Sequence, residues 1–156
     1  MSSQSTTAAE VQFHLEKLRR NLFNECYLIS KGVRSCMQMT VVGLKEANDD
    51  CPGVADMLFD LEQVGLHYNL RSLWFKYKDQ SDVQDGFEAY SFWVYRYSHQ
   101  LPIIKAVEEA DSKGKSILLE WIIGKLLGYS DDAMEQYLVL NVMNEVKTDT
   151  TVLKQD

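Results

Sequence analysis

The stretch VQFHLEKLRRNLFNECYLISKGVRSCMQMTVVGL, residues 11–44, carries the longest hydrophobic periodicity in the chain. Apolar residues recur in it at steps of three and four, which is the spacing of one face of an amphipathic helix. Thr7 and Glu10 form a capping-box signature just before it. Gly32 lies inside the stripe, and a glycine costs about 1 kcal/mol in a helix interior without forbidding it. The sequence therefore predicts one long helix over about residues 8–47, bent or divided at Gly32.

Two further long helices are expected after the turn-forming residues 46–53. The first covers about residues 54–78 and carries apolar residues on more than one face. The second follows a capping box formed by Ser81 and Gln84, and Pro102 ends it. Its apolar positions alternate by four and three, the heptad pattern of a helix that packs on a partner helix: Val83, Phe87, Tyr90, Val94, Tyr97 and Leu101.

Three shorter helices are predicted beyond the proline, over about residues 103–111, 116–127 and 131–146. Gly114 and Gly128 stand where the first two of these helices would end, at positions that favour glycine. Ser130 is a suitable N-cap for the third. These signals divide the C-terminal part of the chain into helices of about three turns each.

As a whole, the sequence predicts an all-α, single-domain helical bundle. Its 156 residues suit one domain, and 8 glycines and 2 prolines are few for an all-β chain with many turns. We expect this domain to span residues 1–156. Its polar ends, residues 1–6 and 147–156, are expected to fray.

The charge balance is acidic, with 16 Lys and Arg against 23 Asp and Glu and a net charge of −7. Direct nucleic-acid binding is disfavoured, because its affinity comes largely from basic residues that neutralise phosphates. An acidic surface of this kind suits a nucleic-acid mimic, an inhibitor of the type carried by phages and mobile elements. The residues predicted to form it are Glu46, Asp49, Asp50, Asp56, Asp60, Asp131, Asp132 and Glu135.

Three cysteines without a Cys-x-x-Cys pair predict free thiols, which are typical of a reducing cytoplasm. The first ten residues, MSSQSTTAAE, lack the basic start and apolar run of a secretory signal. No apolar run is long enough to span a membrane. The three histidines are scattered, so neither a metal nor a cofactor site is predicted. We therefore expect a cytoplasmic localisation.

Ten of the seventeen aromatic residues fall between Tyr68 and Tyr97. Such a concentration fits an aromatic core, a protein–protein interface, or a platform on which bases stack. An exposed face rich in Trp, Tyr and Arg has the composition of an interface. The candidate interface residues are Trp74, Tyr77, Phe92, Trp93, Tyr95 and Arg96.

Two carboxylate pairs, Asp85 with Glu88 and Glu108 with Asp111, each have a spacing of three residues. On helices, each pair would share a face, and four converging carboxylates suit Mg²⁺. This pattern resembles that of the all-α nucleotide pyrophosphohydrolases, which use acidic pairs on two helices. The resemblance implies a Mg²⁺-dependent hydrolase as an alternative, and the other interpretation is a solvated acidic face.

The segment IIGKLLGYSDDAMEQYL, residues 122–138, has the pattern of a helix-turn-helix. It is similar to the segment of AraC-type activators in which a helix ending in Leu-Gly-Tyr-Ser leads into a recognition helix. That resemblance implies a transcription regulator. The second helix carries Asp131, Asp132 and Glu135 and no base, which disfavours DNA contact. A simple helical hairpin explains the same pattern.

The leading hypothesis is a small helical protein that acts by binding another protein, as an adaptor or as a regulatory or inhibitory protein. The sequence shows no nucleophile motif, phosphate-binding glycine loop or dinucleotide fingerprint, which favours a protein without enzymatic activity. A helix of about 40 residues would span roughly 60 Å. A second subunit would cover its far end, so a homodimer is predicted.

Overall fold

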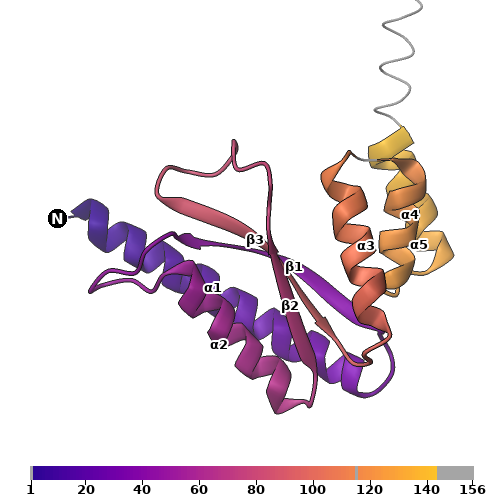
Figure 1. Ribbon diagram of the computed structural model, residues 1–156, viewed down its shortest axis with the longest axis horizontal. Helices are drawn as coiled ribbons and strands as arrows, with labels where there is room; N and C mark the ends of the chain where they lie inside the picture. Colours follow the sequence, from indigo (N-terminus) through magenta and orange to yellow (C-terminus); the bar gives the residue numbers. More distant parts are fainter. Residues whose placement is uncertain (1, 115, 144–156) are drawn as a thin grey trace, which may run out of the picture. The chain divides into compact units, whose positions relative to one another are not determined.

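The computed structural model describes residues 2–114 and 116–143, and it is mixed α/β rather than all-α. Helices and a three-stranded antiparallel sheet alternate along the first part of the chain, and helices alone make up the second part (Figure 1). The chain divides into two compact units, Met1–Leu101 and Pro102–Asp156. The prediction of an all-helical domain is therefore wrong for the N-terminal unit.

The N-terminal unit packs two helices on one face of the sheet. These helices are α1 (Ser2–Ser30) and α2 (Val54–His67), which lie side by side (Figure 1). The strands are β1 (Cys36–Leu44), β2 (Arg71–Lys76) and β3 (Phe87–Tyr95), in the order β1-β3-β2. The central strand β3 is antiparallel to both neighbours, so that Phe92 stands opposite Met39 on one side and Trp74 on the other.

The hydrophobic core lies between the helices and this face of the sheet. Leu22, Cys26 and Ile29 of α1 are fully buried, as are Met57 and Leu61 of α2. The sheet contributes alternate residues to the same core: Met37, Met39 and Val41 from β1, and Phe92 and Val94 from β3. The apolar stripe of α1 is thus buried within its own unit.

The first predicted helix, residues 8–47, is wrong at both ends. In the structure α1 begins at Ser2 and ends at Ser30. Gly32 breaks the helix, with φ of +76°, and the Val33 amide donates to the Leu28 carbonyl at 2.9 Å to close the end. The helical spacing holds as far as Ile29, and beyond Gly32 the chain is strand β1. The β-branched run from Thr40 to Val42 favours a strand there.

The two other long helices predicted are also wrong. The helix expected over residues 54–78 ends at His67, and Asn69 turns the chain with φ of +59° into strand β2. Three of the six heptad positions expected after Ser81 lie in strand β3, whose residues 91–95 are all buried. A strand buried on both faces shows no alternation of apolar and polar residues, and its aromatic residues match a heptad by coincidence.

The three shorter C-terminal helices are confirmed, with shifted ends. They are α3 (Gln100–Ser112), α4 (Ile117–Leu126) and α5 (Asp131–Tyr137), and the π-helical turn η1 (Leu138–Met143) continues α5. Pro102 lies in the first turn of α3, where a missing N–H costs no hydrogen bond. It therefore does not separate two helices.

The predicted caps of these helices are confirmed. Gly114 and Gly128 have φ of +135° and +90° just after α3 and α4. The Ser130 side chain accepts a hydrogen bond from the Ala133 amide at 3.1 Å at the start of α5.

The predicted frayed ends have different outcomes. Residues 2–6 belong to α1, whereas residues 147–156 lie outside the described residues. Among the helices that the structure describes, none is both long and apolar enough to cross a bilayer.

Candidate functional site

Three of the six predicted interface residues are buried. Phe92 belongs to the core and is fully buried, and Trp93 and Tyr95 are at most 5% exposed. Trp74 is 37% exposed and stacks on Phe92, with ring centroids 6.0 Å apart and planes 13° apart. Arg96 is exposed and lies over the ring of Tyr97 at 5.1 Å. The aromatic residues of β3 therefore do not form one exposed face.

The sixth residue, Tyr77, belongs to a polar network on the sheet face opposite α1 and α2. Its hydroxyl lies 3.0 Å from Thr40 Oγ1 and accepts from Gln38 Nε2 at 3.4 Å, both on β1. The Gln38 side chain and the Trp93 indole each donate to Ser91 Oγ on β3, at 3.0 and 3.1 Å. These side chains satisfy one another and join β1, β3 and the residue that follows β2.

The two carboxylate pairs lie in different units of the chain. Asp85 lies in the loop before β3 and Glu88 on the strand, so the two do not share a helix face. Glu88 Oε2 is bound by Lys76 Nζ at 2.9 Å and by the Tyr90 hydroxyl at 3.1 Å. The Lys76 hydrogen bond lowers the pKa of Glu88.

The second pair, Glu108 and Asp111, does lie on one helix, α3, in the C-terminal unit. Within residues 2–114 and 116–143, no three His, Cys, Asp or Glu side chains gather closely enough to hold a metal ion. The all-α scaffold implied by the resemblance to pyrophosphohydrolases is absent from the N-terminal unit.

The predicted acidic residues are spread over both units. Glu46, Asp49 and Asp50 are exposed in the loop after β1. Asp56 accepts from the Gly53 amide at 3.2 Å at the start of α2, and Asp60 pairs with Arg19 at 3.4 Å. Asp131, Asp132 and Glu135 are exposed on α5, in the other unit.

The three cysteines are free and buried. Burial raises the pKa of Cys26 and of Cys36 to about 12, so both are protonated thiols at neutral pH. His14 of α1 accepts from the Val42 amide at 3.5 Å, and its burial lowers its pKa. These groups stabilise the N-terminal unit and are not arranged for nucleophilic chemistry.

The helix-turn-helix pattern corresponds to the hairpin of α4 and α5. Lys125 joins its two arms, because its ammonium group binds Asp131 Oδ1 at 2.7 Å and donates to the Tyr129 carbonyl at 3.2 Å. The same ammonium group lies 5.9 Å from the centre of the Trp121 ring. One of the three acids of α5, Asp131, is thus bound by the hairpin's own cation.

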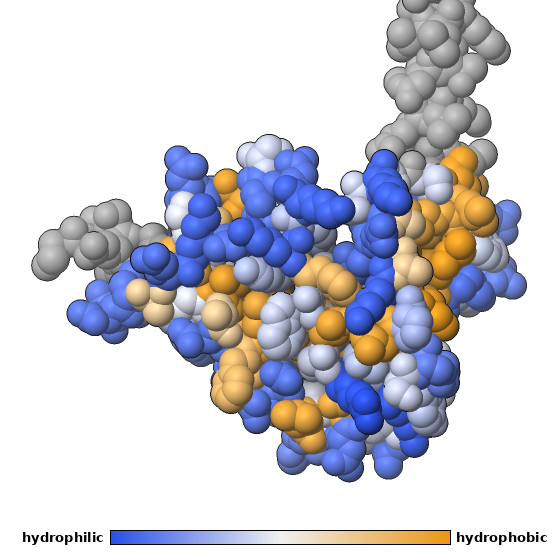
Figure 2. Space-filling view, in the orientation of Figure 1, coloured by the Kyte–Doolittle hydropathy of each residue, from blue (hydrophilic) through white to orange (hydrophobic). Residues whose placement is uncertain are grey.

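Several large apolar side chains of this hairpin are exposed. Leu118, Ile122 and Val139 are 69%, 42% and 51% exposed. Leu118, Trp121 and Ile122 lie three and four residues apart and therefore on one side of α4. Figure 2 shows apolar surface gathered over the C-terminal helices on the face in view. We call the set Leu118, Trp121, Ile122, Leu138 and Val139 the C-terminal apolar surface.

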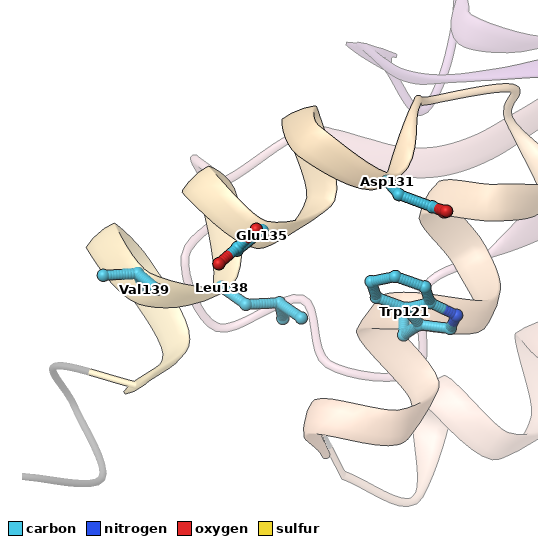
Figure 3. A pocket seen from close by; sticks show the side chains of 5 residues that line it. All are labelled: Trp121, Asp131, Glu135, Leu138 and Val139. Carbon is cyan, nitrogen blue, oxygen red and sulfur yellow. The ribbon is translucent and has the colours of Figure 1, made fainter.

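A groove of about 400 Å³ runs along this surface. Figure 3 shows Leu138 pointing toward Trp121, with Asp131 and Glu135 on α5 and Val139 on η1. Asp131 is bound by Lys125, whereas Glu135 makes no ion pair with any described residue. The groove therefore joins an apolar floor to one carboxylate that lacks a cation.

A second hollow of about 390 Å³ lies on the other side of the hairpin. Gly124 and Met134 are both buried there, and a side chain at Gly124 would overlap the Met134 sulfur atom. The Tyr137 hydroxyl donates to Glu120 at 3.4 Å across its edge. This side of the hairpin holds the two helices together, which leaves the Trp121 side as the candidate binding surface.

Sequence reasoning missed this surface because it weighed residues 122–138 only as a helix-turn-helix or a simple helical hairpin and did not ask which side of the hairpin is exposed. The signal was present in α4, whose sequence ILLEWIIGKL is apolar all round with a single acid and a single base. A helix of this kind must be covered on all sides to be stable in water.

A comparison of the chain with protein-family models, curated proteins and solved structures finds no match in any of the three.

Proposed function

We propose that this chain acts by binding protein through the C-terminal apolar surface, as an adaptor or regulatory protein without enzymatic activity of its own. The observation that supports this most is the exposure of Leu118, Ile122 and Val139 beside the groove floored by Trp121 and Leu138. Contiguous exposed apolar side chains rimmed by charge mark protein-interaction sites. We also propose a cytoplasmic site of action, because all three cysteines are free thiols.

The sequence-based reason for a homodimer no longer applies, because α1 ends at Ser30 and buries its stripe in its own unit. The protein-binding hypothesis itself now depends on α4, α5 and η1 rather than on the aromatic residues of β3. An aromatic or aliphatic side chain of a partner that binds in the groove would displace water from it. Each Å² of apolar surface buried in this way stabilises the complex by about 25 cal/mol.

The second candidate is the acidic mimic. The exposed acids Glu46, Asp49 and Asp50 support it, since no described cation pairs with any of them. Asp56 and Asp60, by contrast, are engaged within their own unit. A mimic would lose its partner as salt rises, whereas an apolar contact would retain it.

The test is affinity purification of tagged protein from its native cells, with an untagged copy expressed alongside. Wild type is compared with the double variant Leu118→Ser/Ile122→Ser and with the matched control Phe59→Ser/Leu66→Ser on α2. Phe59 and Leu66 are 62% and 51% exposed, so the control removes a similar apolar area elsewhere.

We expect one protein, or the untagged copy, to co-purify with wild type and control and to be lost from the Leu118→Ser/Ile122→Ser variant. Equal recovery by all three proteins would overturn the proposal. Loss from the α2 variant alone would do the same.

A further inference from the structure

The exposed side of α1 is basic and aromatic, the complement of the groove on the C-terminal apolar surface. The residues on this side recur at steps of four and three: Phe13, Lys17, Arg20, Asn24, Tyr27 and, just past the helix, Lys31. Phe13 is 70% and Tyr27 is 53% exposed, and the Lys31 ammonium lies 5.7 Å from the centre of the Tyr27 ring. We call these six residues the basic α1 face.

The cations of this face are not neutralised within the chain. Lys17, Arg20 and Lys31 make no ion pair with any described residue, although Arg19, on another side of α1, pairs with Asp60. Two exposed acids border the face: Glu10, three residues before Phe13, and Glu16, which accepts from Gln12 at 3.4 Å. The α1 helix thus presents exposed rings and unpaired cations in a chain whose net charge is −7.

The groove presents the opposite features. Its floor is Trp121 and Leu138, and Glu135 lacks a cation. Asp131 and Glu135 lie one turn apart on α5, and like charges at this spacing repel. Lys125 shows which interactions a cation makes at this site: its ammonium group binds Asp131 and also approaches the Trp121 ring. A second cation, supplied by a partner, would give Glu135 the ion pair that it lacks.

We propose that the occupant of the groove is the basic α1 face of a second copy of this chain. The exposed face from Phe13 to Tyr27 spans about 21 Å, which is longer than the roughly 15 Å of the ten residues of α4, so it is long enough to lie along the whole of that helix. The proposed pair is reciprocal: each copy carries both surfaces, and each α1 face lies in the groove of the other copy. This inference rests on the proposed function and names the partner.

The pairing also explains why a chain of this acidity associates with itself. Net charge of one sign opposes association, and opposite charges placed at the contact offset that repulsion and fix its geometry. Exposed Phe13 and Tyr27 supply the apolar area that enters the groove, while the cations meet Glu135.

Sedimentation velocity on the full chain tests the proposal through charge reversal. We expect wild type to be a dimer. Glu135→Lys alone and Lys17→Glu/Arg20→Glu alone should each weaken the dimer at least about tenfold, because each places like charges at both contacts. Asp132→Lys is the matched control on α5, since Asp132 is exposed but does not line the groove, and it should leave the dimer within about twofold of wild type.

Mixing the two weakened variants is the decisive step. In a mixed dimer the Glu135→Lys groove meets an acidic α1 face, and the unaltered groove meets an unaltered α1 face. Both contacts are then attractive, so the mixture should dimerise while each variant alone does not. Misfolding of either variant would not produce this recovery.

A monomeric wild type would overturn the proposal, and so would a dimer that neither reversal weakens. If the chain is monomeric yet loses a different protein in the Leu118→Ser/Ile122→Ser purification, the proposed function stands and the inference about the second copy fails. If no protein is lost in that purification either, both fail.

Discussion

The two units of the chain differ in how far the apolar side chains of their helices are buried. In the N-terminal unit, α1 turns Leu22, Cys26 and Ile29 into a core shared with α2 and the sheet. In the C-terminal unit, α4 leaves Leu118 and Ile122 exposed. Hydrophobic residues at helical spacing therefore indicate that one face of a helix is buried. They do not indicate whether that face is buried against the same chain or against a partner. The N-terminal unit provides its own cover, whereas α4 keeps exposed apolar side chains, at which we propose that a partner binds.

Thiol reactivity should show the largest difference between the units. Burial raises the pKa of Cys26 and Cys36 from 9.0 to about 12, which lowers the thiolate fraction about a thousandfold. We expect native protein to resist alkylation at both. A cysteine placed in the C-terminal unit by Ile122→Cys should react at once in dilute, monomeric protein. Mass spectrometry after timed alkylation checks this, and fast labelling of Cys26 in folded protein would contradict a closed core.

Replacing one leucine by alanine in each unit tests the same difference in burial. Leu22 is fully buried and Leu118 is 69% exposed. Leu22→Ala should lower the free energy of unfolding by about 2–5 kcal/mol, and Leu118→Ala should change it by no more than about 0.5 kcal/mol. Urea titration followed by circular dichroism measures both. Similar costs for the two substitutions would remove the distinction between core and surface.

Gly32 tests the boundary between α1 and β1. Its φ of +76° favours glycine, and a Cβ there would meet no atom within 4 Å, so only the backbone opposes substitution. Gly32→Ala should therefore cost about 1 kcal/mol of unfolding free energy. Gly32→Asn should cost less, because asparagine tolerates this conformation better. A stabilising Gly32→Ala would instead support a continuous helix through this position.

The smallest effect concerns pH and His14. Burial, and after it the charge of Lys17, lower the pKa of His14 below 6.5, so the unfolded chain binds this proton more readily than the folded one. The contribution of His14 to stability is complete above its unfolded pKa and declines as pH falls through the lower folded pKa. Between about pH 7 and pH 5, wild type should lose more stability than His14→Gln. Parallel losses would show that burial does not lower the pKa of His14 in the folded chain.

The sequence predicted those elements whose signals are local. The caps at Gly114, Gly128 and Ser130 were found because each depends on one residue at a helix end. The stripe of α1 was found as far as Ile29, where one side of the helix is buried and the other is exposed. These features need no knowledge of the rest of the fold.

The strands could not be found in the same way. Residues 91–95 of β3 are buried on both faces of the sheet, so their polarity does not alternate. Their pairing with β1 joins residues more than 50 positions apart, as between Met39 and Phe92, and no local pattern records it. The sheet is therefore a property of tertiary packing, and the aromatic heptad was a chance match.

Part of the candidate site could be predicted from the sequence. Residues 122–138 were recognised as a helical hairpin, and the structure confirms α4 and α5 there. What the sequence did not show is the groove between Trp121 and Leu138, because it depends on how η1 continues α5. Nor did it show that Lys125 binds Asp131 and leaves Glu135 without a cation.

The most direct test of the central claim is photo-crosslinking in the native cells, with benzoylphenylalanine placed at position 122 or, as a control, at position 59. Both Ile122 and Phe59 are exposed large apolar residues on helices, one on the C-terminal apolar surface and one on α2. We expect a discrete protein adduct from position 122 and none from position 59. No adduct from position 122, or the same adducts from both positions, would contradict it.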